Sequence, residues 1–378
     1  MCAKKKLNCL FLSGDLHYLC KKINALAVAV TKFSLLASVK KNLYMNLRNF
    51  STFFIAILLT AFRAMASDTE VDGIYYDFDP VRKLATVTYK GDSYNSYEDE
   101  YSGDIVIPAT VTYEGEEYRV YDIKEYAFSG CSSITNIDIP EGITEIGEYA
   151  FSGCSSITNI DIPEGMTKIR DFVFYNCDSL ASVSIPESIT LIGEGAFADC
   201  SSLASIIIPE SVTQIGALAF DGCSSLTSVE IPKGVTEIGY NTFYGCSSLT
   251  SIVIPKGVTS IGMSAFEDCS SLSNISIPQG VTEIRYNTFA GCSSLISVEI
   301  PKGVTSIGEY AFEYCSSLVS VTIPEGVTSI GIRTFYNCTS LASVEIPKSI
   351  TKIGGAAFSS CSSLESVALP EGLISIGD

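Results

Sequence analysis

Histidine is almost absent from this chain: its 378 residues include only His17. We expect His17 to lie outside the mature protein, which would then contain no histidine. A chain without histidine cannot use a Ser-His-Asp or Cys-His arrangement for catalysis, and it cannot bind metals through imidazole. The sequence also lacks a C-x-x-C pair for zinc and a glycine-rich phosphate loop between a strand and a helix. We therefore expect no enzyme activity, no cofactor and no metal site.

Basic residues are scarce beyond residue 66. Residues 1–66 hold ten Lys and Arg and one acid, so the 14 basic and 41 acidic residues of 67–378 give that part a net charge of −27. An acidic body of this kind repels nucleic acid and anionic lipid, so neither is an expected partner. Basic partners and divalent cations are compatible with this negative charge. The alternative interpretation is that the acidic surface keeps an exported protein soluble.

The segment before Ser67 has the composition of a targeting region. A short basic segment at 45–48 precedes an apolar run at 53–62, and Ala64-Met65-Ala66 stands before Ser67 as an A-x-A cleavage site. This order predicts a secretory signal peptide over 45–66, cleaved near Ala66-Ser67, and hence a secreted or cell-surface protein.

Residues 1–44 have two interpretations. In the first, the start of the chain is assigned too early and Met45 is the true initiator. In the second, 1–44 is a real extension whose apolar run, 23–39, is a marginal membrane segment. Nothing in 67–378 resembles a transmembrane helix. We therefore expect no membrane insertion of the mature chain.

A 23-residue unit is repeated eleven times. Cysteine recurs from Cys131 to Cys361 with every gap equal to 23, and a phenylalanine lies three residues before each cysteine. Proline keeps the same period from Pro140 to Pro370. A fixed period of this length predicts a solenoid, in which each unit forms one coil and packs against its neighbours. The distance from a partial copy at 105–108 to the next copy exceeds one period by nine residues, which implies a nine-residue insertion.

The apolar positions of each unit predict a strand. In the copy that begins at Leu226, Val229 and Ile231 alternate with Ser228 and Glu230, so one row of side chains faces inward and the other outward. The proline that follows ends the strand because it has no N–H group to donate to a ladder. Strands of successive copies then stack in parallel register.

The part of each unit that follows the proline predicts shorter elements. Ile238 and Phe243 point back to the interior, and Gly239 between them allows a turn. The step before each cysteine is too short for a full helix, so we expect a 3₁₀ or single helical turn there. The predicted fold is a β-rich leucine-rich repeat solenoid over 120–378, with a parallel sheet on one face and short strands and helical turns on the other.

The unit V-T-x-I-G-x-x-A-F-x-x-C-S-S-L-x-S-V-x-I-P resembles the BspA-type leucine-rich repeat family. A few copies depart from it, with Val173, Thr242, Thr288 and Thr334 in place of Ala, Arg170 and Arg285 in place of Gly, and Asp178 and Thr339 in place of the first Ser. The resemblance implies an exported or surface protein of a host-associated anaerobe or mucosal parasite. It also implies adhesion to host matrix proteins or to other cells, and it brings no catalytic motif.

Residues 67–119 differ from the repeat. Segments 73–78 and 84–89 flank Asp79-Pro80, and segments 110–113 and 118–121 flank a Glu-Gly-Glu-Glu turn, so each pair predicts a β-hairpin. A solenoid needs its terminal core covered, and we predict that 67–119 forms an N-terminal cap with the first partial repeat. A separate ligand-binding module is the alternative. At the other end the chain stops in mid-repeat, which indicates a truncation or a tolerated frayed end.

The repeated cysteines and threonines have structural interpretations. Equivalent Cβ atoms on adjacent coils are expected about 4.8 Å apart with parallel vectors, whereas a disulfide needs about 3.8 Å and converging vectors. We therefore expect buried thiols that act as small hydrophobes. The Thr column, from Thr144 to Thr351, is expected to hydrogen-bond backbone groups in the turns rather than to bind ice or carry glycans.

Two surfaces are candidates for binding a partner. The first is the outward row of the predicted strands, where polar residues vary between copies: Asn136, Asp138, Asn159, Asp161, Ser184, Glu230, Glu299, Thr322 and Glu345. The second is a group of tyrosines near the predicted helical turn: Tyr240, Tyr244, Tyr286, Tyr310, Tyr314 and Tyr336. Exposed tyrosines are favoured interface anchors, and a broad curved face suits a protein or glycan ligand.

Three classes of function can be compared with these features, and the third, an enzyme, is disfavoured. We expect an adhesin or receptor-type module that recognises an extracellular protein or glycan through the repeat surface. A passive spacer that displays another domain is the alternative. A glycosidase would need a fixed pair of carboxylates, whereas the outward column varies too freely to hold one. The sequence does not predict the oligomeric state.

Overall fold

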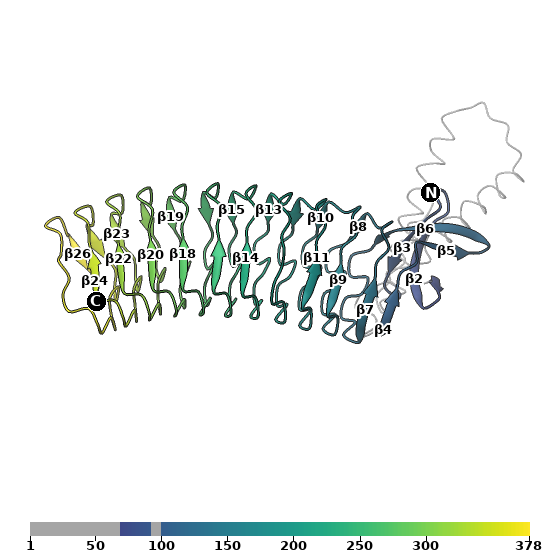
Figure 1. Ribbon diagram of the computed structural model, residues 1–378, viewed down its shortest axis with the longest axis horizontal. Helices are drawn as coiled ribbons and strands as arrows, with labels where there is room; N and C mark the ends of the chain where they lie inside the picture. The colour runs from purple at the N-terminus through teal and green to yellow at the C-terminus, as the bar shows by residue number, and fades with distance from the viewer. Residues whose placement is uncertain (1–68, 92–99) are drawn as a thin grey trace, which may run out of the picture. The chain divides into compact units, whose positions relative to one another are not determined.

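The computed structural model describes residues 69–91 and 100–378, which form two N-terminal β-hairpins and a stack of β coils (Figure 1). These residues contain strands and turns and no helix. Within them, no segment has the helical length and apolar character required to cross a membrane. The predicted signal peptide at 45–66 and the segment 1–44 lie outside the described residues.

One row of strands follows the predicted positions in most coils. We call its outward surface the long-strand face, and the strands are β7 (Ile134–Asp138), β9 (Asn159–Asp161), β11 (Ser182–Ser184), β14 (Ser228–Glu230), β16 (Ser251–Val253), β18 (Asn274–Ser276), β20 (Ser297–Glu299), β22 (Ser320–Thr322) and β24 (Ser343–Glu345). Neighbours pair in parallel, but the ladder is interrupted: β9 pairs β11, β14 pairs β16, and β18 to β24 form a four-stranded sheet. The single parallel sheet that the sequence predicts is therefore divided into shorter ladders.

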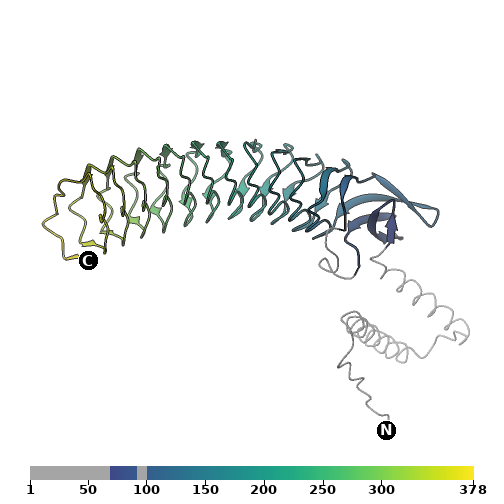
Figure 2. The same ribbon diagram turned by 90° about the horizontal axis from the view of Figure 1, so that it is seen from below.

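A second row of two-residue strands runs along another side of the coils. These are β8 (Glu145–Ile146), β10 (Lys168–Ile169), β12 (Leu191–Ile192), β13 (Gln214–Ile215), β15 (Glu237–Ile238), β17 (Ser260–Ile261), β19 (Glu283–Ile284), β21 (Ser306–Ile307), β23 (Ser329–Ile330), β25 (Lys352–Ile353) and β26 (Ser375–Ile376). Most of them pair in parallel with their equivalents in a neighbouring coil, as in Glu237 with Ser260, but this ladder is also interrupted, between β8 and β10, between β13 and β15 and between β17 and β19. The stack bends gently into an arc (Figure 2).

The segment before each cysteine is not helical, which corrects the expected 3₁₀ or single helical turn. Around Phe151, the Ser152 N–H donates to the Tyr149 carbonyl three residues back, but the Phe151 N–H donates to Val173 in the next coil. Tyr149 has a left-handed φ of 57°. Because alternate N–H groups bond to the next coil, a continuous helix cannot form.

The glycine column has a different role from the one expected. Gly239 does not adopt a positive φ. A Cβ atom at Gly239 would lie 2.9 Å from the Ala217 Cα, and one at Gly262 would lie 2.4 Å from the Tyr240 backbone nitrogen. Glycine is needed here because the backbones of adjacent coils approach closely, not because the chain turns.

The core is built from columns of identical side chains. Leu226, Val229 and Ile231 are buried as predicted. The phenylalanines from Phe128 to Phe358 form a continuous stack, with ring centroids of neighbours 5.2 to 5.7 Å apart. Such stacking is favourable at these distances and makes every coil depend on its neighbours.

The cysteines from Cys131 to Cys361 are buried free thiols. From Cys154 onward each thiol donates to the carbonyl of the phenylalanine 26 residues earlier, as in Cys246 to Phe220 at 3.2 Å. Threonine hydroxyls likewise donate to the preceding coil, as in Thr190 to the Thr167 carbonyl at 3.2 Å. The thiol and hydroxyl columns therefore join coils to each other, beyond the turn contacts expected for threonine.

The N-terminal residues form the two predicted hairpins. The first joins β2 (Ile74–Asp79) to β3 (Leu84–Thr88), and the second joins β5 (Thr110–Tyr113) to β6 (Glu116–Ile123). β1 (Thr69–Val71) pairs with β2, and β4 (Gly103–Val106), which contains the start of the partial copy, pairs in parallel with β7. β6 also pairs with β8, so the sheet continues from the hairpins into the short-strand row.

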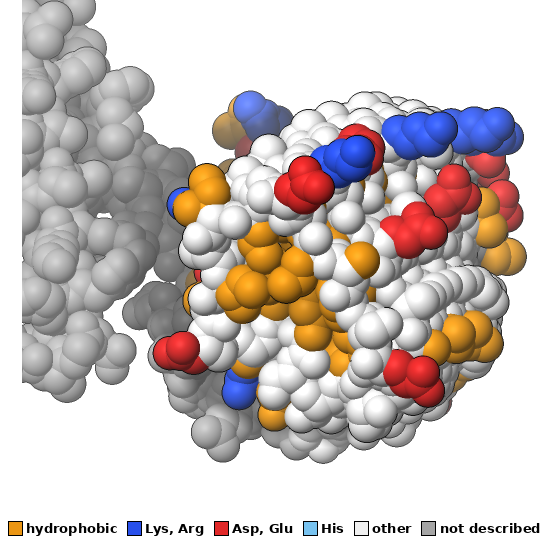
Figure 3. Space-filling view, turned by 90° about the vertical axis from the view of Figure 1, so that its left-hand side faces the viewer, with side chains coloured by type: hydrophobic (Ala, Val, Ile, Leu, Met, Phe, Trp, Pro, Cys, Tyr) orange, Lys and Arg blue, Asp and Glu red, His pale blue; other side chains and the backbone are white. Residues whose placement is uncertain are grey.

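Tyr101 covers the first ring of the phenylalanine stack. Its ring centroid lies 4.7 Å from that of Phe128, and the side chain is 2% exposed. The hydroxyl donates to the Thr88 carbonyl at 2.7 Å and accepts the Tyr75 N–H at 3.0 Å. At the opposite end the final coil leaves an apolar patch exposed (Figure 3), and Ile374 is 78% exposed.

Candidate binding surfaces

The long-strand face presents all nine residues predicted on the outward row, and each of them is exposed. The strands are only three residues long in most coils, with a buried central residue between two outward side chains, as in Ser228-Val229-Glu230. Parallel pairing aligns equivalent positions, so Ser184 lies beside Asp161 and Thr322 beside Glu345. The face is therefore a polar surface whose chemistry changes one coil at a time.

Three of the nine predicted residues line one groove on this face. The lining includes Glu299, Thr322 and Glu345 together with the residues that follow the prolines, Lys302, Glu325 and Lys348. The groove has a volume of about 930 Å³. Glu299 and Glu345 stand two coils apart, roughly 10 Å at the usual strand spacing. The groove is thus lined by both carboxylates and ammonium groups.

Asn136, Asp138, Asn159, Asp161, Ser184 and Glu230 do not line this groove. Where the ladder is interrupted between β11 and β14, Ile207 is 83% exposed. The long-strand face is thus an extended surface with a concave region near its C-terminal coils, rather than a uniform groove.

The six predicted tyrosines lie on both sides of the phenylalanine turn. Tyr286 packs edge-on against Tyr310 at 5.3 Å between ring centroids, and Tyr314 packs edge-on against Tyr336 at 5.6 Å. Tyr240 instead donates its hydroxyl to Glu194 at 2.9 Å, and this hydrogen bond is the main cause of its raised pKa. Tyr240, Tyr286 and Tyr314 are exposed, while the remaining three are half-buried.

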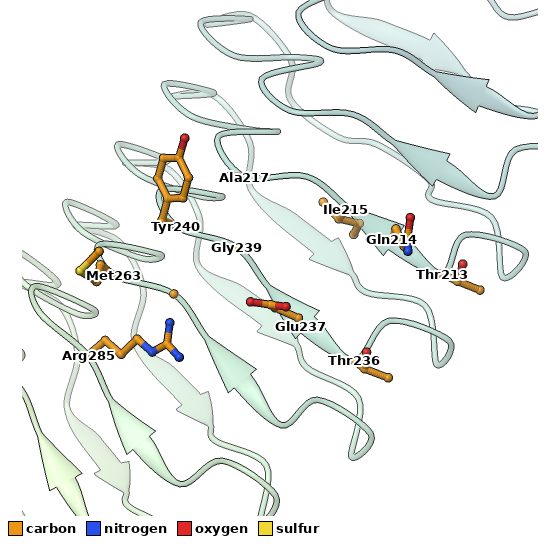
Figure 4. Close-up of a pocket in the computed structure, with 11 residues that line it drawn as sticks. Thr213, Gln214, Ile215, Ala217, Thr236, Glu237, Gly239, Tyr240, Met263 and Arg285 are labelled. Carbon is orange, nitrogen blue, oxygen red and sulfur yellow. The ribbon is translucent and has the colours of Figure 1, made fainter.

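A second groove, which the sequence does not predict, lies beside the short-strand row (Figure 4). Its volume is about 470 Å³, and its lining includes Glu237, Tyr240, Met263 and Arg285. A signal for it exists in the sequence, since Arg285 occupies a position that is glycine in most copies. A single sequence position does not show which neighbours surround it, so this departure alone does not predict a groove.

Two half-buried acids have unusual electrostatics. Burial raises the pKa of Asp221 to about 6, and the nearby carboxylate of Asp199 contributes in the same direction. Burial and the carboxylate of Glu145 likewise raise the pKa of Asp122 to about 6. Among the described residues no group of three or more His, Cys, Asp and Glu side chains is arranged to hold a metal ion.

The comparison with known families agrees with the repeat pattern. The family described as "BspA type Leucine rich repeat region" matches in six copies over residues 104–227, 191–315 and 282–378. No curated protein matches the chain.

Several solved structures are similar to this chain. A leucine-rich repeat protein from Bacteroides ovatus is 31% identical, with 79% of this chain and 93% of that chain covered and a TM-score of 0.48. A leucine-rich cell surface protein from Faecalibacterium prausnitzii is 29% identical, covering 73% and 94%, with a TM-score of 0.45. A leucine-rich repeat protein from Eubacterium ventriosum is 22% identical, covering 80% and 95%, and its TM-score of 0.50 supports the same fold.

The family match extends over most of the chain and includes every complete copy of the 23-residue unit. It confirms the resemblance on which the adhesion hypothesis rests. With the stacked coils and their cysteine and phenylalanine columns, it shows that the chain belongs to the BspA-type leucine-rich repeat family.

Proposed function

We propose that this chain is an exported or cell-surface binding protein, an adhesin that recognises an extracellular protein or glycan through the long-strand face. The observation that carries the proposal is the combination of a constant core with a variable exposed row. Nine polar residues of that row face solvent in register, and three of them line a groove. A surface of this kind can be changed coil by coil without altering the fold.

Family membership supports a binding role over an enzymatic one, because function in a repeat scaffold resides in its extended surface. The groove offers carboxylates at Glu299 and Glu345 and ammonium groups at Lys302 and Lys348. These groups suit hydrogen bonding to hydroxyl, amide or charged groups of a partner. The proposed surface location rests on the family and on the predicted signal peptide at 45–66.

The test compares two variants with matched changes of charge. Asp161, Glu230 and Glu299 are exposed on the long-strand face, and replacing all three by Lys reverses the charge of that face. The control replaces Glu125, Glu148 and Glu309, which are exposed beside the turns, by Lys. Binding of the purified protein to immobilised matrix glycoproteins and host-cell glycans is measured by surface plasmon resonance, with and without calcium.

Saturable binding that the long-strand variant loses and the control variant keeps would support the adhesin. Equal loss in both variants would mean that only the net charge matters. Binding that both variants keep would exclude the long-strand face as the site. No binding by a well-folded protein would contradict the adhesin proposal and favour the passive spacer.

A further inference from the structure

The groove beside the short-strand row has a bare backbone floor. Gly239 and Gly262 lie at its base, and the close approach of the preceding coil prevents a side chain at either position. Tyr240 and Met263 stand on one side, 45% and 52% exposed. Glu237 stands on the other side, on β15, and Arg285 closes the end (Figure 4). The groove is therefore apolar along one wall and charged along the other.

These walls coincide with a break in the repeat. The position six residues before each cysteine is acidic in the first four copies: Glu125, Glu148, Asp171 and Glu194. In the next four copies it is Ala217, Tyr240, Met263 and Tyr286. A row of acids is thus replaced by neutral side chains, three of which are large and exposed. Tyr, Met and Arg are enriched in protein interfaces, and an exposed patch of large side chains beside a groove marks a docking site.

The charge of the groove depends on which acid each arginine of this column contacts. Arg170, in the same column as Arg285, forms an ion pair with Glu145 of the preceding coil. The residue equivalent to Glu145 beside Arg285 is Ser260, so Arg285 pairs within its own coil, through Nε to Glu283 at 3.6 Å. Among the described residues Glu237 takes part in no ion pair. Once Arg285 and Glu283 balance each other, the groove retains the negative charge of Glu237.

We propose that this groove binds a basic segment of a partner polypeptide, with a lysine or arginine against Glu237 and a neighbouring apolar side chain on Tyr240 and Met263. The net charge of −27 on residues 67–378 attracts cationic segments and speeds their encounter. The exposed Tyr240 ring can accept a cation over its face, and Met263 adapts to different apolar shapes.

The geometry favours an extended segment over a helix. The floor is formed by the backbone of successive coils, which permits close approach of another backbone. The Arg285 guanidinium and the Glu237 carboxylate point toward one another across the groove (Figure 4). One group donates hydrogen bonds and the other accepts them, so together they can bind a peptide carbonyl and a peptide N–H or ammonium group. This surface is separate from the groove of the long-strand face, so the two proposals can fail independently.

The test uses fluorescence anisotropy of the full-length protein with three short synthetic peptides. The first alternates Lys and Leu, the second alternates Glu and Leu, and the third alternates Lys and Ser. Glu237→Gln removes the carboxylate, and Tyr240→Ser with Met263→Ser removes the apolar wall without changing charge. The matched controls are Glu148→Gln and Val319→Ser, both at exposed positions away from the groove. Circular dichroism checks that each exposed-site variant is folded.

We expect saturable binding of the Lys-Leu peptide and weaker binding of the other two. Glu237→Gln and the double variant should each weaken binding about tenfold, the usual effect of losing one charge-assisted contact or one apolar anchor. The controls should stay within about twofold. The proposal would be overturned if no peptide bound or if the Glu-Leu peptide bound more tightly. It would also be overturned if Glu148→Gln weakened binding as much as Glu237→Gln, or if the double variant bound as well as the wild type.

Discussion

At the scale of the residue, equivalent side chains of successive coils make the same contact, and the buried cysteine thiols are an example. Burial raises the pKa of the Cys177 thiol to about 12, and burial likewise raises the pKa of the other thiols from Cys200 to Cys361. The thiol also donates to a carbonyl of another coil, so its hydrogen contributes to the core. These cysteines are structural residues with almost no thiolate near neutral pH.

The first prediction concerns thiol reactivity. In native protein at pH 8 we expect the cysteines from Cys131 to Cys361 to resist alkylation by iodoacetamide, because the thiolate is scarce and inaccessible. In denaturant all of them should react. Mass spectrometry of tryptic peptides assigns each site and separates these cysteines from those before residue 67. Rapid native labelling in the interior coils would contradict the burial of the column.

The second prediction concerns Asp221. Its folded-state pKa of about 6 lies above its ordinary value of 3.8, so the folded protein binds the proton more tightly than the unfolded chain. The contribution of Asp221 to the free energy of unfolding should therefore increase as pH falls from about 6 toward 4. The same contribution should be lost as pH rises through about 6. Asp221→Asn should stabilise the protein at pH 7 relative to wild type, with a smaller difference at pH 5. Urea midpoints at both values measure this, with Glu148→Gln as the control.

At the scale of the element, hydrogen bonds between coils decide the local conformation. The turn before each cysteine alternates bonds within the coil and bonds to the next coil, as at Ser152 and Phe151. The same close approach leaves no space for a side chain in the glycine column. These turns are therefore specified by neighbouring coils more than by their own residues.

The third prediction compares two glycines of the same coil. A Cβ atom at Gly262 would lie 2.4 Å from a backbone nitrogen, whereas the nearest atom to a Cβ at Gly257 is a carbonyl oxygen at 3.7 Å, an ordinary contact. Gly262→Ala should destabilise the protein by about 2 kcal/mol or more because the backbones must separate. Gly257→Ala should have little effect. Urea unfolding followed by circular dichroism measures both, and equal effects would refute the close-approach explanation.

At the scale of the whole molecule, stability is a sum of coils and their contacts with neighbours. Ten consecutive phenylalanine pairs stack without a gap, and both strand rows keep the period of the repeat. Removal of one complete unit leaves every column continuous, whereas a removal of another length shifts all later columns.

The fourth prediction follows from this arrangement. Deletion of residues 303–325 removes one unit and joins Lys302 to Gly326, which preserves the order of columns. The shortened protein should fold, with the same circular dichroism spectrum and a slightly lower melting temperature. Deletion of 303–324, one residue fewer, should expose the later coils to limited proteolysis. Equal protease resistance of the two deletions would contradict the column model.

The sequence alone determined the coil, its period and the inward or outward direction of most side chains. This was possible because a repeat places the same residue in the same environment many times, so that Leu226, Phe243 and Cys246 each report the burial of a whole column. The two hairpins were also predictable, since their turns carry local signals. The nine outward residues of the long-strand face followed directly from strand alternation.

Only the tertiary structure decided how coils contact one another. It replaced the expected helical turn by alternating bonds, assigned the glycines to close approach, and brought Glu237, Met263 and Arg285 from three successive coils into one groove. These features depend on atoms that lie a whole repeat apart in the sequence and on side-chain direction between coils. A periodic pattern shows which residues share a column, but the contacts across columns arise only when the backbone has been stacked.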